Sequence, residues 1–244
     1  MQPFTFNTVR QIVNAPGSAL ALADYCRRLG MQRPLLVTDP GLMSIGLVPP
    51  VIAAIEEAGL ALTVFDQVRE DPPEDTVMAA RELAASAEVD GVVAVGGGSS
   101  MDVAKVVATL LAGEQALADM YGVDQVAGGR LPLILVPTTA GTGSEVTPVA
   151  VITTGATTKA GVSSAVLLPD IAILDADLTL GLPPAVTAMT GVDAMVHAIE
   201  AYASASANNN PLSRMLAIQA LELMGAALLR AVHDGKDHAA RADM

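Results

Sequence analysis

Short apolar runs alternate with stretches of helical periodicity between about residue 17 and residue 175. A short run that is apolar at every position is typical of a strand buried on both faces, as in a parallel sheet covered by helices. Between these runs, one helix is expected to end at Gly59 and another to span residues 74–88. The alternation predicts an α/β fold with a parallel sheet. The predicted strands span residues 34–38, 60–65, 92–95, 133–136 and 171–174.

The pattern changes after Asp175, beyond which no strand candidate follows. Pro183 and Pro184 can begin a helix, because proline is tolerated in the first helical turn. We predict that helix over residues 185–204 and a second helix over residues 212–232. The remainder of the chain is therefore expected to be helical.

These patterns divide the chain near residue 180. We predict an α/β domain over residues 1–180 and the start of an all-helical domain over residues 181–244. The helical part is short and lacks a Gly, Pro or polar tail at its end, so we expect the chain to be truncated within that domain.

Composition and charge narrow the class of protein. Apolar residues make up 52% of the chain but aromatic residues only 2%, so the core must consist of Ala, Val, Leu, Ile and Met. Lys and Arg number 13 against 26 Asp and Glu, which gives a net charge of −13. The electrostatic field of this net negative charge repels phosphate backbones and anionic membrane surfaces. We therefore expect neither nucleic acid nor a membrane as a partner.

Cysteine content and the N-terminal sequence bear on localisation. The chain has a single cysteine, Cys26, which cannot form an internal disulfide. Residues 1–10 show no pattern of a secretory signal, and the apolar runs are shorter than a membrane span requires. These features predict a cytoplasmic protein.

A glycine-rich turn, Gly96–Gly98, lies between the predicted strand 92–95 and a predicted helix. Glycines let the backbone approach a ligand closely and adopt positive φ, and the free N–H groups of a helix N-terminus attract phosphate. The sequence is neither GxGxxG nor a Walker A motif, so an ordinary tight turn is an equally open interpretation.

A second loop, residues 137–145, follows the predicted strand 133–136 and carries four hydroxyls and two glycines. Such a loop can offer side-chain and backbone donors to ribose and phosphate oxygens, although a solvated loop has the same composition. Because it also follows a buried strand, both loops are expected at the carboxyl edge of the sheet, where ligands bind in α/β folds.

Asp39 directly follows the predicted strand 34–38. A carboxylate there can accept hydrogen bonds from an adenosine ribose and would repel a 2′-phosphate, so NAD would be preferred over NADP. The alternative is a turn-forming aspartate before Pro40 and Gly41, and local sequence favours that alternative.

Asp193 and His197 are four residues apart in the predicted helix 185–204 and therefore share one helix face. A carboxylate and an imidazole at this spacing can bind a divalent ion such as zinc or iron(II), although an intrahelical hydrogen bond is the common outcome. His233 and His238 are the other histidines, and both lie in a stretch that we interpret as a solvated loop.

Four sequence blocks together resemble the iron-containing (group III) alcohol dehydrogenases. This resemblance extends over essentially the whole chain and implies a metal-dependent, NAD(P)-linked oxidoreductase, with an N-terminal α/β nucleotide-binding domain and a C-terminal helical domain. The blocks are GGGSSMDVAK (96–105), PTTAGTGSEVTP (137–148), LLPDIAILDADLTLGLPP (167–184) and TGVDAMVHAIEAYAS (190–204).

The resemblance also implies roles for individual residues. Asp193 and His197 match two ligands of the catalytic metal, iron(II) or zinc, and Asp39 matches the acidic residue that contacts the adenosine ribose of NAD. The residues implied at the cofactor are Asp39, Gly96, Gly97, Gly98, Ser99, Asp102, Thr138, Thr139, Thr142 and Lys159.

Two departures from the family pattern affect these expectations. The family metal site needs two further histidines from later helices, which this sequence does not contain. Asp71 stands where the family has an asparagine that helps to hold the nucleotide. We therefore expect incomplete metal binding and an altered nucleotide contact.

The implied activity is reversible oxidation of a small alcohol to an aldehyde or ketone, with the metal acting as a Lewis acid and hydride passing to the nicotinamide. A homo-oligomer is expected. One alternative is a metal-independent reductase of the same superfamily, resembling the maleylacetate reductases, against which the presence of Asp193 and His197 argues. A second alternative is a catalytically silent nucleotide-binding fragment.

Overall fold

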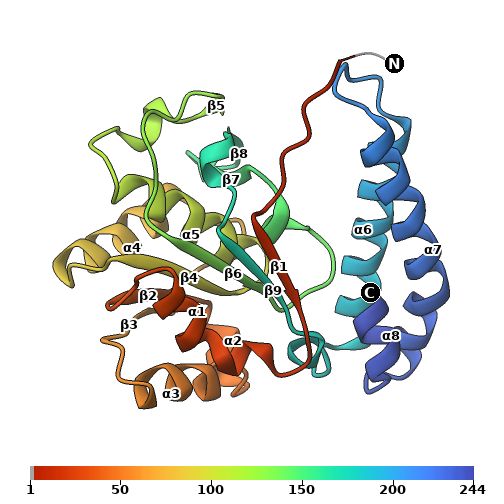
Figure 1. Cartoon of the computed structure of the whole chain (residues 1–244), viewed down its shortest axis with the longest axis horizontal. Helices are drawn as coiled ribbons and strands as arrows, with labels where there is room; N and C mark the ends of the chain where they lie inside the picture. Colours follow the sequence, from red (N-terminus) through yellow and green to blue (C-terminus); the bar gives the residue numbers. More distant parts are fainter. Residues whose placement is uncertain (1–2) are drawn as a thin grey trace. The chain divides into compact units, whose positions relative to one another are not determined.

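The computed structural model describes residues 3–244, and the chain forms two compact units (Figure 1). Residues 9–137 and 144–175 form one unit, here called the sheet unit. Residues 3–8, 138–143 and 176–244 belong to the other, here called the helical unit.

The sheet unit is built on six parallel strands in the order β1-β9-β6-β4-β2-β3. The predicted parallel sheet is therefore confirmed, and each predicted strand exists within a few residues of its expected position. The strand predicted at 60–65 is shorter, and an edge strand at the start of the chain was not predicted. The strands are β1 (Gln11–Asn14), β2 (Pro34–Val37), β3 (Thr63–Phe65), β4 (Gly91–Gly96), β6 (Leu133–Pro137) and β9 (Ile171–Leu174).

Helices cover both faces of this sheet. Figure 1 shows α4 and α5 on one face and α1 to α3 on the other. The helices are α1 (Leu22–Arg28), α2 (Pro40–Ser44), α3 (Pro49–Glu57), α4 (Glu74–Ser86) and α5 (Gly98–Leu110). Short 3₁₀ turns lie at Ser18–Ala21, Leu117–Asp119, Ser144–Val146, Ala165–Leu167 and Ala176–Thr179.

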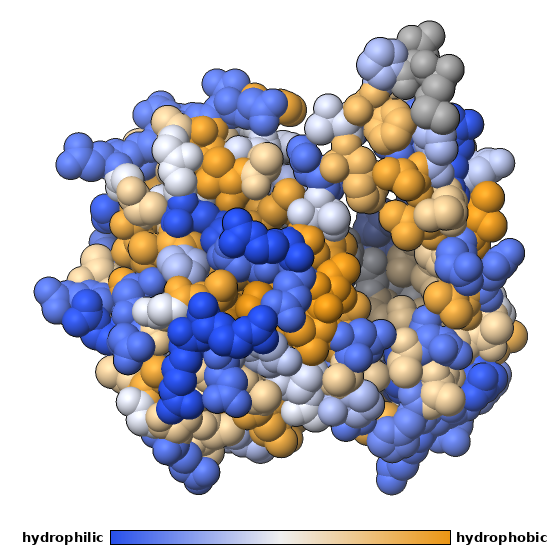
Figure 2. All heavy atoms as spheres, viewed as in Figure 1, coloured by the Kyte–Doolittle hydropathy of each residue, from blue (hydrophilic) through white to orange (hydrophobic). Residues whose placement is uncertain are grey.

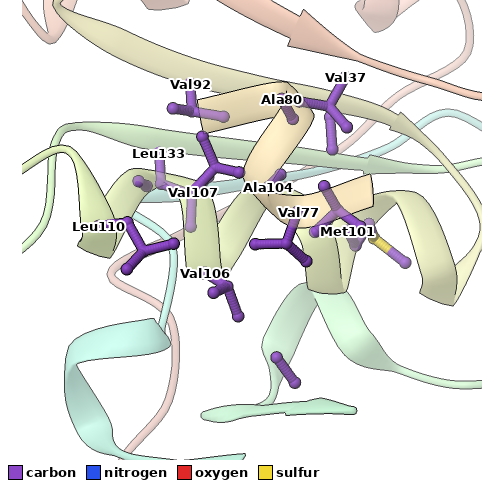
Figure 3. Packing of buried hydrophobic residues seen from close by; sticks show 14 of the residues in the cluster. Val37, Val77, Ala80, Val92, Met101, Ala104, Val106, Val107, Leu110 and Leu133 are labelled. Carbon is purple, nitrogen blue, oxygen red and sulfur yellow. The ribbon is translucent and has the colours of Figure 1, made fainter. Parts of the chain in front are cut away.

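Aliphatic side chains from the sheet and from α4 and α5 form the main core (Figure 3). Alternate residues of the central strands point into it, because side chains alternate between the faces of a strand. Burial of one such side chain stabilises the fold by about 1.5–3 kcal/mol. Labelled members in Figure 3 are Val37, Val77, Ala80, Val92, Met101, Ala104, Val106, Val107, Leu110 and Leu133.

A small second sheet, of order β5-β8-β7, was not predicted from the sequence. It consists of β5 (Gly122–Val123), β7 (Val149–Thr154) and β8 (Thr158–Ser163), and β7 pairs with β8 in antiparallel orientation. The signal was present in β7, where buried Ala150 and Ile152 alternate with exposed neighbours. The threonines of the hairpin concealed this alternation.

The helical unit contains α6 (Pro184–Ala203), α7 (Pro211–His233) and α8 (His238–Asp243). Both predicted long helices are confirmed, but His238 begins a helix rather than lying in a loop. Asn210 caps α7 by accepting hydrogen bonds from the backbone of Leu212 and Ser213. Gly191 permits a close approach of α7, since a Cβ atom there would overlap Cδ1 of Leu228.

Large apolar side chains are exposed along α6 and α7, and Figure 2 shows hydrophobic surface over these helices. By length and composition, α7 is also the one helix within residues 3–244 that is able to span a membrane, with a mean hydropathy of 1.6 over its most apolar window. The length and hydropathy of α7 are weak evidence for a membrane span, because core helices of soluble proteins meet the same criterion.

Candidate functional site

The carboxyl ends of β4 and β6 are adjacent in the sheet unit. The two strands are parallel and pair in register, with Gly96 opposite Pro137. The glycine-rich turn and the loop that begins at Thr138 therefore leave the sheet at the same edge. This confirms the expectation that both segments start where α/β folds bind ligands.

The glycine-rich turn leads directly into the N-terminus of α5. Gly97 is the N-cap and, as a glycine, has no side chain that could accept hydrogen bonds from the first N–H groups of this helix. Its first N–H groups are thus open to an anion, and the helix dipole favours negative charge there.

The turn needs glycine for close packing rather than for positive φ. Gly97 has φ −78° and ψ −171°, an extended conformation, so the positive φ that glycine permits is not used at this position. At Gly96, however, a Cβ atom would lie 2.6 Å from both Cβ and Oγ of Ser100. Any side chain at this position would push the first turn of α5 away from β4.

Asp39 lies at the end of β2 and is the N-cap of α2. Its Oδ1 accepts a hydrogen bond of 3.0 Å from the backbone N–H of Leu42. A Cβ atom on Gly96 would be 3.7 Å from Cδ1 of Leu42, so α2 lies next to the glycine-rich turn. The turn-forming alternative is thus realised, and it leaves Oδ2 of Asp39 able to accept a ribose hydroxyl.

Thr38, the residue before Asp39, carries a buried hydroxyl without a hydrogen-bond partner among the residues that the structure describes. Buried polar atoms are nearly always satisfied in native proteins. This atom therefore marks an unmet hydrogen bond at the same edge of the sheet.

Asp102 is nearly buried in α5 and is fully engaged in hydrogen bonds. Its Oδ1 accepts from Ser144 Oγ at 2.7 Å, and its Oδ2 accepts from the backbone N–H of Val151 at 2.9 Å. Burial raises the pKa of Asp102, against the opposing effects of Lys105 and these hydrogen bonds. The carboxylate thus ties α5 to β7, a role that the sequence did not indicate.

The threonines of residues 138–143 belong to the helical unit. Thr138 is buried, Thr139 is half-buried and Thr142 is exposed. Within that unit, Gly141 approaches Thr190 of α6 so closely that a Cβ atom on the glycine would lie 2.9 Å from the threonine Cβ. The loop is therefore packed on the helix that carries Asp193 and His197.

Lys159 of β8 forms an ion pair with Asp71, with 2.7 Å between Nζ and Oδ1. Both side chains are more than half exposed. Asp71 has φ 49°, and its carbonyl oxygen accepts a hydrogen bond from Thr153 Oγ1. The residue that departs from the family pattern thus holds the lysine that the resemblance assigns to the nucleotide.

Asp193 and His197 lie on the same face of α6, as predicted. Oδ1 of Asp193 is 3.8 Å from Nε2 of His197, and both side chains are about half exposed. This separation is too long for the intrahelical hydrogen bond of the alternative interpretation. The pair remains free to converge on a common ligand.

Nothing else in residues 3–244 completes a metal site around this pair. No group of three His, Cys, Asp or Glu side chains suited to a metal occurs among those residues. His233 ends α7, and Nδ1 of His238 lies 3.2 Å from Asp177 Oδ1. Neither histidine is grouped with Asp193 and His197.

The fold and these segments define an α/β protein with a glycine-rich turn at a helix N-terminus, followed by a helical region that carries a carboxylate–imidazole pair. Two family models match the chain. That of the iron-containing alcohol dehydrogenases matches residues 10–176, and that of the C-terminal part of the Fe-containing alcohol dehydrogenase family matches residues 187–244. The chain belongs to the iron-containing alcohol dehydrogenase family.

Relatives and solved structures agree with this assignment. The chain is 38% identical to sulfoacetaldehyde reductase of Bilophila wadsworthia (strain 3_1_6) over 239 residues, which cover 98% of this chain and 61% of that protein. A crystal structure of 1,3-propanediol oxidoreductase has a TM-score of 0.95 and 33% identity, over 99% of this chain and 63% of that one. Sulfoacetaldehyde reductase from Bifidobacterium kashiwanohense in complex with NAD+ has a TM-score of 0.91 and 32% identity, over 100% of this chain and 64% of that one. The chain thus spans about 60% of the length of the curated relatives that it matches.

Proposed function

We propose that this chain binds NAD(H) at the carboxyl edge of its parallel sheet and belongs to an enzyme that interconverts small alcohols with aldehydes or ketones. The observation that carries the proposal is the N-terminus of α5, which follows the glycine-rich turn and has a glycine, Gly97, as its N-cap. The NAD+ complex of the related sulfoacetaldehyde reductase supports the same cofactor.

The residues present fit a dinucleotide. Gly96 to Ser99 offer backbone N–H groups to a diphosphate, and Asp39 offers a carboxylate oxygen to an adenosine ribose. The unmet hydrogen bond of Thr38 lies beside Asp39 and is consistent with a polar ligand at this edge. Thr138, Thr139 and Thr142 are the proposed hydroxyl contacts of the adjoining loop.

Each of these groups has a distinct task in the proposed reaction. The positive end of the α5 dipole holds the diphosphate, and the negative charge of Asp39 disfavours a 2′-phosphate, so NAD is preferred over NADP. When bound, NAD+ supplies the acceptor for the hydride that leaves the alcohol carbon.

The described residues do not by themselves fit a retained catalytic metal ion. Asp193 and His197 supply one oxygen and one nitrogen ligand, whereas catalytic sites normally use three protein ligands. No third ligand is grouped with them in residues 3–244. We infer that the pair supplies part of a site for iron(II) or zinc, and that this chain retains such an ion only weakly.

The substitution Gly98→Val tests the proposed cofactor site. A β-branched side chain in the first turn of α5 occupies the space next to the N–H groups that would bind phosphate, so NADH binding is expected to be lost. The matched control is Gly113→Val, a glycine with open space around it and no positive φ. Binding is measured by NADH fluorescence and folding by circular dichroism.

The two variants distinguish a ligand site from a structural turn. Loss of NADH binding in a folded Gly98→Val protein, with binding retained in Gly113→Val, supports the proposal. Normal NADH binding by Gly98→Val would show that the turn is purely structural. A cytoplasmic location and a homo-oligomer stay predictions, the latter supported by the exposed apolar side chains of α6 and α7.

A further inference from the structure

Lys105 is a completely buried cation in the middle of α5. Lysine is almost never fully buried unless its ammonium is paired and hydrogen-bonded, because desolvation of the charge costs several kcal/mol. The groups around its Nζ atom must therefore offset the cost of removing the charge from water.

The ammonium of Lys105 donates to three oxygens that lie outside its own helix. Ser144 Oγ and the carbonyl oxygen of Val149 are each 2.7 Å from Nζ, and Thr147 Oγ1 is 3.4 Å away. All three acceptors belong to the short segment 144–149, which leads from residues 138–143, here called the Thr/Gly loop, into β7. Lys105 therefore attaches this segment to α5.

Charged groups face Lys105 from two directions. Asp102, one turn earlier in α5, has its Oδ1 3.7 Å from Nζ and itself accepts the hydroxyl hydrogen of Ser144. Glu145, in the 3₁₀ turn, acts on the lysine through its charge. From β7 the group that contacts the ammonium is the neutral carbonyl of Val149, so both charges that act on the ammonium are negative.

This arrangement fixes both ends of the Thr/Gly loop to the sheet unit. One end is Pro137, which pairs with Gly96 in the sheet. The other end is Ser144, which Lys105 and Asp102 bind from α5, the helix that begins at the glycine-rich turn. The same helix thus bears the proposed phosphate site and holds the segment that follows the loop.

We propose that Lys105 is a positioning residue for the dinucleotide: its buried ammonium holds segment 144–149 on α5, the helix that begins at the proposed phosphate site, and so fixes the residues that follow the Thr/Gly loop. This inference rests on the proposed function. With none of its surface exposed, Lys105 does not touch the cofactor, and its effect on affinity passes through Ser144 and Val149.

The charge state of Lys105 gives this role a pH dependence. Burial lowers the pKa of Lys105 to about 8, against the opposing charges of Asp102 and Glu145. Above that pH the amine keeps two N–H donors for three acceptors and loses its attraction to both carboxylates. NADH affinity is therefore expected to fall as the pH rises through about 8.

The experiment compares Lys105→Met with Arg130→Met in the full chain. Arg130 is also a largely buried cation, paired with Asp170 and bonded to backbone carbonyls, but it precedes β6 and so lies at the amino edge of the sheet. At about pH 7, Lys105→Met is expected to weaken NADH binding roughly tenfold, whereas Arg130→Met leaves the affinity of the folded protein unchanged.

A pH series separates positioning from general destabilisation. Between about pH 7 and 9 the affinity of the wild type should fall, while that of Lys105→Met should stay level because the titrating group is absent. Unchanged affinity in Lys105→Met, an unchanged pH profile, or an equal loss in Arg130→Met would each overturn the proposal. If Lys105→Met does not fold, Ser144→Ala removes one acceptor and is expected to weaken binding severalfold.

Hydrogen exchange on the ligand-free protein separates this inference from the proposed function. The amide of Val151, which donates to Asp102, and the amides of segment 144–149 should exchange faster in Lys105→Met, with β4 and β6 unaffected. If the wild type binds no NADH, the proposed cofactor site is wrong, and exchange still tests the anchor. Equal exchange of residues 144–151 in the wild type and the variant would show that Lys105 does not hold the segment.

Discussion

Gly141 lies so close to Thr190 that a Cβ atom on the glycine would be 2.9 Å from the threonine Cβ and 3.0 Å from its carbonyl oxygen. Thr190 precedes Asp193 by one helical turn. The Thr/Gly loop and the carboxylate–imidazole pair are thus joined within the helical unit by a contact that tolerates no side chain.

This contact predicts the effect of Gly141→Ala. The added methyl group overlaps the backbone of α6, so unfolding free energy should fall by about 1–3 kcal/mol. The control is Gly161→Ala on β8, where nothing lies within 4 Å and φ is not positive. That variant should change stability by less than about 0.5 kcal/mol in urea unfolding. Equal stability of the two variants would contradict the packing.

Asp39 has two roles, and substitutions separate them. Asp39→Asn keeps an oxygen to cap α2 through Leu42 but removes the charge, so NADPH affinity should rise relative to NADH by a factor on the order of ten. Asp39→Gly makes the same charge change and also loses the cap. Parallel fluorescence titrations with NADH and NADPH measure the ratio, and an unchanged ratio in Asp39→Asn would exclude this carboxylate from the ribose site.

The ion pair between Asp71 and Lys159 is expected to compete with the cofactor phosphates. Asp71→Asn releases the lysine, so NADH affinity should increase severalfold. Stability should hardly change, since exposed ion pairs contribute about 0–1 kcal/mol. Lys159→Met should weaken binding and abolish the effect of Asp71→Asn in the double variant. A gain that persists in the double variant would show that Asp71 acts independently of Lys159.

The ion pair between Asp170 and Arg130 is expected to make the stability of the fold decrease at acidic pH. Burial alone would raise the pKa of Asp170, but hydrogen bonds from Arg130 and from the backbone of Leu133 outweigh it and hold the pKa below its usual 3.8. A lowered pKa contributes stability above the unfolded value, and that stability is lost as the pH falls through the folded value, below 3.8.

Asp170→Asn should therefore lower stability by about 1–3 kcal/mol near neutral pH and make the acid limb of the stability profile shallower. Urea unfolding between about pH 2 and 7 measures both effects. If the free energy of unfolding of the variant fell as steeply with decreasing pH as that of the wild type, other carboxylates would be responsible for the loss of stability in acid.

The sequence predicted the features that depend on local pattern. The strands at Val92 and Leu133 are uniformly apolar because both faces of a parallel sheet are covered, and the helical periodicity of α6 and α7 was equally clear. This pattern also predicted that the segments after β4 and β6 leave the sheet at the same edge, and that Asp193 and His197 share one face of α6.

Features that depend on distant contacts could not be predicted. Lys105 lies in an apolar stretch of α5, and its partner Ser144 is 39 residues away, so no local signal identified the buried network. The pairing of Asp71 with Lys159 spans 88 residues. The hairpin of β7 and β8 escaped prediction because its threonines and Gly155 gave a loop-like composition.

We propose that residues 3–244 suffice to bind NADH but not to retain a metal ion. Equilibrium dialysis of the chain against NADH and iron(II) or zinc, followed by analysis of both ligands, tests it most directly. We expect stoichiometric NADH, and metal well below stoichiometric that falls further in His197→Ala without loss of NADH. Stoichiometric metal in the chain, or absence of saturable NADH binding, would contradict the account.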